Sequence, residues 1–105
     1  MINNVSSIES APSFNTCINA DKSLTKDVAA IVINANPARR YAAFINNSNV
    51  DITLILGESN QGSIGKGIVL KPRGGSYEID ANNLYVGRVC AISAAAVKLS
   101  YVECS

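Results

Sequence analysis

The stretch from Asn36 to Tyr101 constrains the fold most, because it repeats one pattern: a short run of β-branched and aromatic residues that ends at a cluster of Asn, Gly or Pro. The runs lie at residues 28–33, 39–45, 51–56, 68–70, 76–80, 84–86, 89–92 and 97–101. No segment has the periodicity of a long amphipathic helix. Short strands at such regular spacing predict an all-β fold, a single small antiparallel β-sandwich.

Two of these runs are expected to pair directly with each other. Residues 39–45 and 51–56 flank the turn-forming segment Asn46-Asn47-Ser48-Asn49, which predicts a hairpin. In the second run, Ile52, Leu54 and Leu56 alternate with Thr53 and Ile55. We therefore expect the even-numbered face to point at the core.

Size and composition indicate one folded domain. The chain has 105 residues, of which 48% are hydrophobic and 16% charged, and this composition excludes a solvated, disordered chain. No apolar run approaches the roughly 18 residues that span a bilayer, so no membrane is expected as a partner. The net charge of +1, with basic residues scattered from Lys22 to Lys98, gives no field that would attract phosphate backbones, so nucleic acid is not expected either.

The first 26 residues differ from the rest. Apolar side chains stand alone among Asn, Ser and Thr in this part of the chain, and they are Ile2, Val5, Ile8, Phe14 and Ile18. We divide the chain into an extended N-terminal arm, residues 1–26, and a β-sandwich domain, residues 27–105. The arm is either a frayed terminus or a segment that becomes ordered on a neighbouring subunit, and two interpretations stay open. Residues 1–7 lack the basic start and apolar middle of a secretory signal, which indicates synthesis in the cytoplasm.

The three cysteines, Cys17, Cys90 and Cys104, form no C-x-x-C pair, and the chain has no histidine. Neither zinc nor a thioredoxin-like motif is supported. In a cytoplasmic chain the favoured interpretation is three reduced thiols. The alternative is a Cys17–Cys104 disulfide, within or between subunits, formed after the protein leaves a reducing compartment.

Catalytic patterns are weak, so an enzyme is the least expected class and no cofactor or metal is predicted. Glu78 and Asp80 lie two apart on one strand, a spacing that is common by chance, and Ser76 has no histidine to activate it. The glycine-rich segment 57–67 has Ser63 where a phosphate-binding loop needs lysine. A structural loop is the favoured interpretation of that segment.

A family resemblance adds to this interpretation. It rests on Asn36-Pro37-Ala38-Arg39-Arg40-Tyr41, Phe44-Ile45-Asn46-Asn47-Ser48, Asp51-Ile52, Leu70-Lys71-Pro72-Arg73-Gly74-Gly75-Ser76-Tyr77-Glu78, Ala91-Ile92-Ser93-Ala94 and Lys98-Leu99. These motifs resemble a small β-sandwich found in virion proteins of tailed bacteriophages, over about residues 35–103. The resemblance implies a non-enzymatic virion component, made in the host cytoplasm and located in the virion.

Within that class, a capsid decoration (cement) protein that binds and stabilises the head shell is the favoured function. A tail or neck accessory protein is the next alternative. A small carbohydrate- or host-surface-binding module is the alternative outside virion structure, although the chain has no Trp, four Tyr and two Phe. The expected partners are the major capsid protein or other virion proteins, together with further copies of the chain in a dimer or trimer. The expected contacts are the five apolar residues of the arm and Arg40.

Overall fold

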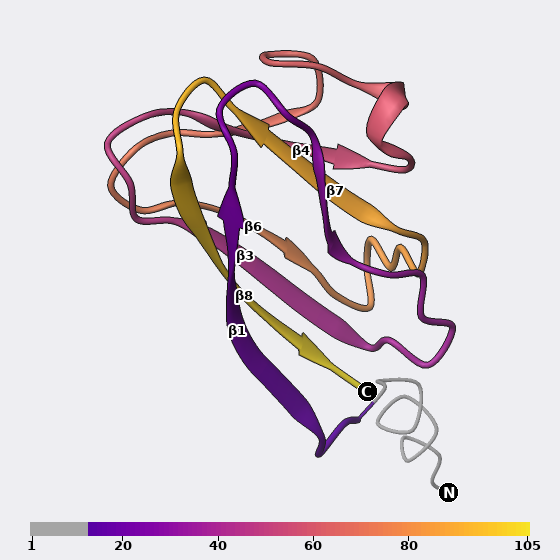
Figure 1. Cartoon of the computed structure of the whole chain (residues 1–105). Coiled ribbons are helices and arrows are strands. Elements are labelled where there is room, and N and C mark those ends of the chain that lie inside the picture. The colour runs from indigo at the N-terminus through magenta and orange to yellow at the C-terminus, as the bar shows by residue number, and fades with distance from the viewer. Residues whose placement is uncertain (1–12) are drawn as a thin grey trace, which may run out of the picture.

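The computed structural model describes residues 13–105, which form two antiparallel four-stranded sheets. Sheet A has the strand order β1-β8-β3-β6 and sheet B the order β2-β7-β4-β5. The strand bounds are β1 Cys17–Leu24, β2 Ala30–Ile33, β3 Tyr41–Asn46, β4 Ile52–Leu56, β5 Ile68–Leu70, β6 Gly75–Ile79, β7 Val89–Ser93 and β8 Val97–Cys104. One short 3₁₀ turn, η1 (Ser59–Gln61), is the helical element among these residues. The all-β sandwich predicted from the sequence is confirmed (Figure 1).

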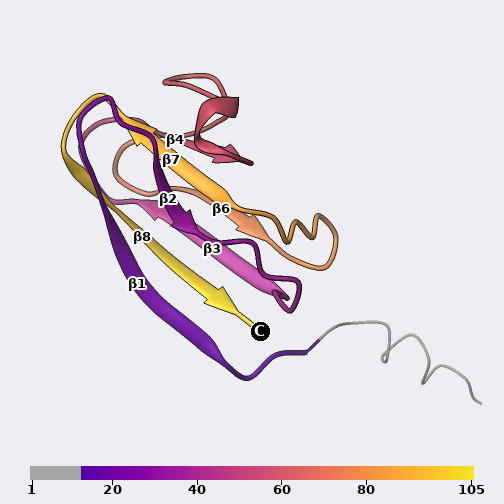
Figure 2. The same cartoon turned by 45° about the vertical axis from the view of Figure 1, so that its right-hand side comes forward.

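The strand order is that of a jelly roll. Strands β1 and β8, β2 and β7, β3 and β6, and β4 and β5 are all antiparallel pairs. The chain is therefore one long antiparallel hairpin, with β1 to β4 in one half and β5 to β8 in the other, that is rolled up. The additional pairs β3–β8 and β4–β7 join these strand pairs into two four-stranded sheets. This rolling places the first and last strands side by side (Figure 2).

The hairpin expected between residues 39–45 and 51–56 is wrong, because β3 belongs to sheet A and β4 to sheet B. The segment between them crosses from one sheet to the other. Asn46, the last residue of β3, stabilises this connection, because its buried side chain donates to the carbonyl oxygens of Val50 (2.7 Å) and Leu70 (2.8 Å). Its Oδ1 also accepts the backbone N–H of Ser48 (2.9 Å).

The domain boundary expected at residue 26 is also wrong. Residues 17–24 form β1, which pairs with β8 along its whole length, from Cys17 opposite Cys104 to Leu24 opposite Val97. Polar side chains hid this strand in the sequence, because an edge strand exposes most of its surface. The sandwich therefore begins no later than Cys17.

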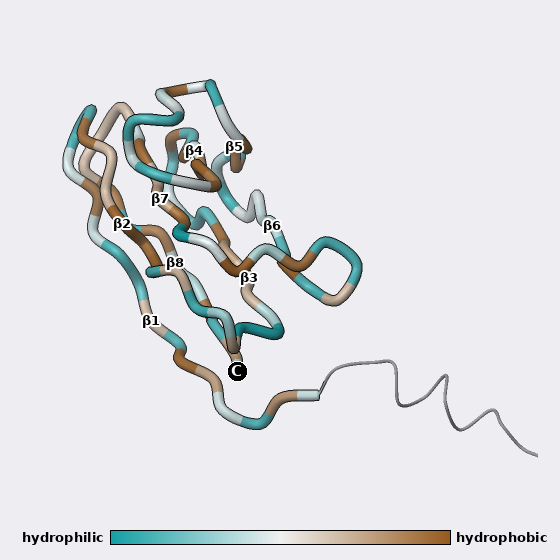
Figure 3. The backbone as a smooth tube through the Cα atoms, turned by 90° about the vertical axis from the view of Figure 1, so that its right-hand side faces the viewer, coloured by the Kyte–Doolittle hydropathy of each residue, from teal (hydrophilic) through white to brown (hydrophobic). Residues whose placement is uncertain are grey.

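The core lies between the inner faces of the two sheets. Its buried members are Leu24, Val32, Ile33, Ala42, Phe44, Ile52, Leu54, Leu70, Ile79, Val89, Ala91 and Leu99. The hydrophobic residues lie mainly in the strands, and the hydrophilic residues lie mainly in the connections and in β1 (Figure 3). Ile52 and Leu54 face this core as expected, whereas Leu56, at the strand end, is 37% exposed.

One buried arginine joins three parts of the chain at an end of the sandwich. Arg39 is fully buried, and its Nε lies 2.8 Å from Oε2 of Glu103 in β8. Its Nη1 donates to the carbonyl oxygens of Tyr85 and Gly87, both at 2.9 Å, and its Nη2 donates to that of Asn34 at 2.7 Å. Four of the five N–H donors of the planar guanidinium thus have acceptors inside the protein.

Replacing Arg39 by Ala is expected to lower the free energy of unfolding by about 3–5 kcal/mol, because it leaves three carbonyl oxygens without this donor and the Glu103 carboxylate without its positive partner. Arg39→Lys keeps the positive charge but loses the planar, branched set of N–H donors. Its unfolding free energy is therefore expected to lie between those of the wild type and Arg39→Ala. Urea denaturation measures both.

The neighbouring Arg40→Ala is the matched control. The Arg40 side chain is half-buried, and its recorded hydrogen bond is a long one, to the Arg39 carbonyl oxygen at 3.3 Å. A loss below about 1 kcal/mol is expected for this variant. Equal losses for the two alanine variants would contradict the assigned role of Arg39.

Candidate interaction surface

The outer face of sheet A carries the strongest candidate site. We define this face by the side chains that point away from sheet B. In register across β1, β8, β3 and β6 they form rows, and the residues of these rows are Cys17, Cys104 and Tyr41; Asn19, Val102, Ala43 and Glu78; Asp21, Ser100, Ile45 and Ser76; and Ser23 and Lys98. Much of this face is apolar or small, which is unusual for a sheet surface turned to solvent.

An aromatic pair covers one end of the face. The ring of Phe14 stacks on the ring of Tyr41, with centroids 5.7 Å apart and an angle of 18° between their planes. Phe14 precedes β1, whereas Tyr41 opens β3 on the far side of β8. The segment before β1 therefore crosses the end of β8, and Phe14 still keeps 45% of its surface exposed.

Tyr41 is held from its other side by a carboxylate. Its hydroxyl donates a hydrogen bond to Glu78 in β6. This hydrogen bond, more than burial, raises the pKa of the Tyr41 phenol above its ordinary value. Glu78, considered above as half of a carboxylate pair, thus orients a neighbouring ring.

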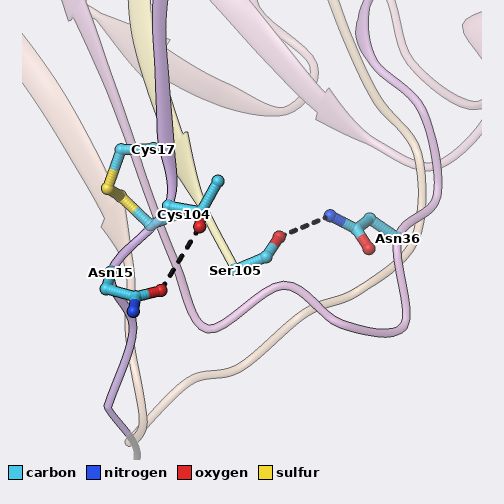
Figure 4. The surroundings of a disulfide bond; sticks show 6 residues. Asn15, Cys17, Asn36, Cys104 and Ser105 are labelled. Carbon is cyan, nitrogen blue, oxygen red and sulfur yellow. Dashed lines mark hydrogen bonds between the residues drawn. A yellow bond between two sulfur atoms is a disulfide. The ribbon is translucent and has the colours of Figure 1, made fainter.

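A disulfide joins Cys17 to Cys104 beside this aromatic pair (Figure 4). The two cysteines lie directly opposite in the β1–β8 ladder, with Cα atoms 4.0 Å apart. The N–H of Ser105 donates to the carbonyl oxygen of Thr16 (2.8 Å), which makes the next pair hydrogen-bonded and the cysteine pair a close, non-hydrogen-bonded one. The preference for three reduced thiols is therefore wrong for these two cysteines.

A shallow depression of about 300 Å³ lies in the middle of the face. Its lining residues come from β1, β8 and β3, and they are Asn19, Ala20, Ala43, Ile45, Ser100, Tyr101 and Val102. Small side chains at Ala43 and Ser100 make the hollow, and Ile45, which is 40% exposed, forms part of its wall. A partner's apolar side chain fits such a site.

A second hollow, of about 520 Å³, lies at the end of the sandwich beside Phe14. It is lined by Ser13, Phe14, Asn15, Ala38, Arg40 and Ser105. Two of the contacts predicted from the sequence, Phe14 and Arg40, therefore lie together. The backbone N–H of Arg40 donates to the carbonyl oxygen of Cys104 at 2.9 Å, which fixes its place next to the disulfide.

The remaining predicted contacts divide into two groups. Ile18 lies on β1 and is 58% exposed, but its place opposite Glu103 puts its side chain on the other face of sheet A from the rows defined above. Ile2, Val5 and Ile8 lie outside the residues that the structure describes.

The glycine-rich loop 57–67 lies over the outer face of sheet B. The N–H of Gly65 donates to Oγ1 of Thr53 at 3.0 Å. A Cβ atom on Gly62 would stand 2.8 Å from Cγ1 of Ile55, so the loop backbone packs directly on β4. These contacts fit the structural interpretation of the loop.

The free cysteine belongs to a second, smaller hydrophobic cluster. Cys90 is a buried free thiol packed with Ile55 and Ile92 under that loop, and burial raises its pKa. Within residues 13–105, no cluster of three or more potential metal ligands occurs, and no helix is long and apolar enough to cross a membrane.

No protein-family model, curated protein or solved structure matches this chain. The assignment of its function therefore rests on its own residues.

Sequence reasoning missed the centre of the candidate surface, namely Tyr41, Ala43, Ile45 and Val102. One signal in the sequence pointed to it, because residues 42–45 are apolar without alternation. A strand of this kind is either covered on both faces within its own domain or has one face covered by a partner.

The disulfide determines how many free thiols the chain should show before and after reduction. The oxidised, unfolded chain should show one free thiol, that of Cys90, and the reduced chain three. Because the bridge closes a loop of 87 residues, reduction should lower the free energy of unfolding by about 4–5 kcal/mol in the chain-entropy model. A thiol reagent in denaturant and urea titrations measure the two effects.

A Cys90→Ala variant is the control for the thiol count, since the oxidised variant should then show none. Three reactive thiols in oxidised wild-type protein would contradict the bridge.

Proposed function

We propose that this protein is a structural virion protein of a tailed phage, a capsid decoration protein that binds the head shell through the outer face of sheet A. The observation that carries the proposal is the apolar centre of that face, where the exposed Ile45 lies with the half-buried Ala43 and Val102 beside the Phe14–Tyr41 pair. A monomer in water gains nothing by exposing this surface, whereas a partner buries it.

Three further observations support the assignment. The resemblance to phage β-sandwich proteins covers residues that build this surface, among them Tyr41 and Ile45. The jelly-roll topology is used by viral capsid proteins, although lectins and cupins share it, so it supports by analogy. The disulfide suits a particle that is released into an oxidising environment.

The chemistry of the surface favours a protein partner over a sugar. Sugar platforms need open aromatic faces, and here one face of the Tyr41 ring is covered by Phe14. The depression beside the pair is lined by aliphatic and small residues, which match apolar side chains of a shell protein.

The test is co-sedimentation of the purified protein with empty phage capsids. Saturable binding at a fixed copy number is expected for the wild type. Ile45→Lys should weaken binding at least about tenfold, because a charge would then be buried in the centre of the contact.

Ile31→Lys is the matched control. Ile31 is the same residue type with the same exposed fraction, 40%, but it lies on β2 in the opposite sheet. This variant should bind like the wild type. Equal weakening by both variants would contradict the choice of face.

A chain that lacks residues 1–12 tests the arm contacts Ile2, Val5 and Ile8 while β1 stays intact. Weaker binding is expected. No binding by the wild type would instead favour a tail or neck accessory protein or a host-surface module.

A further inference from the structure

Strand β1 is the outermost strand of sheet A, and one of its edges has no partner within residues 13–105. The Thr16–Ser105 pair is hydrogen-bonded, so alternation assigns the even residues of β1 to the ladder with β8. The backbone N–H and C=O groups of residues 17, 19, 21 and 23 consequently point away from β8. Figures 1 and 2 both place β1 at the margin of the fold.

The other sheet edges are less open. The edge strands β6, β2 and β5 have five, four and three residues, and β2 has an irregular register with β7. Strand β1 has eight residues in unbroken register. Short or irregular edges protect a sheet against pairing, whereas a long regular edge invites it.

We propose that β1 pairs with β1 of a second copy of this chain, antiparallel about a twofold axis, so that the two A sheets become one continuous sheet. Every outward N–H and C=O group of residues 17–23 then finds a partner. The proposal does not depend on which surface the dimer binds.

The charges of β1 select the register. An axis at Asp21 places two carboxylates opposite each other, and an axis at Lys22 does the same with two ammonium groups, which destabilises a strand pair. An axis at Ala20 pairs Asn19 with Asp21 and Ile18 with Lys22. That register avoids both clashes and uses nearly the whole strand.

The dimer would also extend the candidate interaction surface. Asn19 and Ala20 line the depression on the outer face of sheet A, so a twofold axis at Ala20 places two depressions on one face, on either side of the axis. A shell with repeated sites would bind such a dimer more tightly than a monomer.

Proline at an outward-facing position tests the pairing. Asp21→Pro removes an N–H that points away from β8, so the β1–β8 ladder stays intact. Analytical ultracentrifugation should show a dimer for the wild type and for the control Asp21→Ala, and a monomer for Asp21→Pro. Far-ultraviolet circular dichroism checks that all three variants are folded.

A cross-link tests the register. Ala20→Cys should form a disulfide-linked dimer on oxidation, because Ala20 faces its own copy across the axis as a close, non-hydrogen-bonded pair. Lys22→Cys, on the same face of the same strand, should not, because its partner cysteine lies four residues further along the strand, about 14 Å away at a rise of about 3.4 Å per residue.

A monomeric wild type would overturn the proposal and leave the edge to a strand of another protein. A dimer that persists in Asp21→Pro, or that cross-links through Lys22→Cys and not Ala20→Cys, would overturn it as well.

Discussion

The buried guanidinium of Arg39 is the interaction on which the candidate surface depends. A buried charge is tolerated only when it is fully paired, and Arg39 meets that condition by taking Glu103 from β8 and carbonyl oxygens from two separate loops. Asn36 extends the network, since its amide donates to the same Glu103 carboxylate at 3.3 Å. The end of sheet A is thereby fixed relative to the loops around it.

That fixed end sets the position of the surface residues in turn. The residue after Arg39 donates its N–H to Cys104, and the next, Tyr41, lies in one row with the disulfide. The bridge holds β1 against β8, and Phe14 can therefore reach across β8 to stack on Tyr41. An internal ion pair, a covalent link and an aromatic stack thus together fix the position of this face.

The sequence predicted seven of the eight strands, missed β1, and marked a further run at residues 84–86 where the structure has no strand; it predicted the pairing poorly. Runs such as residues 52–56 and 97–101 show their strands through alternation, which is a local signal. Pairing in a jelly roll joins distant residues, such as Cys17 with Cys104, and no local pattern encodes that choice. Strand β1 was missed because Asn19, Asp21, Lys22 and Ser23 suit an exposed edge, and Arg39 looked like its neighbour Arg40 because burial of one arginine depends on the tertiary fold. The candidate site was predicted in part, through Phe14, Arg40 and the two cysteines, whereas Ile18 lies on the other face of the sheet.

We propose that the outer face of sheet A contacts the capsid shell. An electron cryomicroscopy reconstruction of capsids saturated with the protein tests it most directly, because a sandwich has two distinguishable sheet faces. We expect density in which Tyr41, Ala43, Ile45 and Val102 face the shell. Density in which sheet B and the loop 57–67 face the shell, with sheet A turned to solvent, would contradict it.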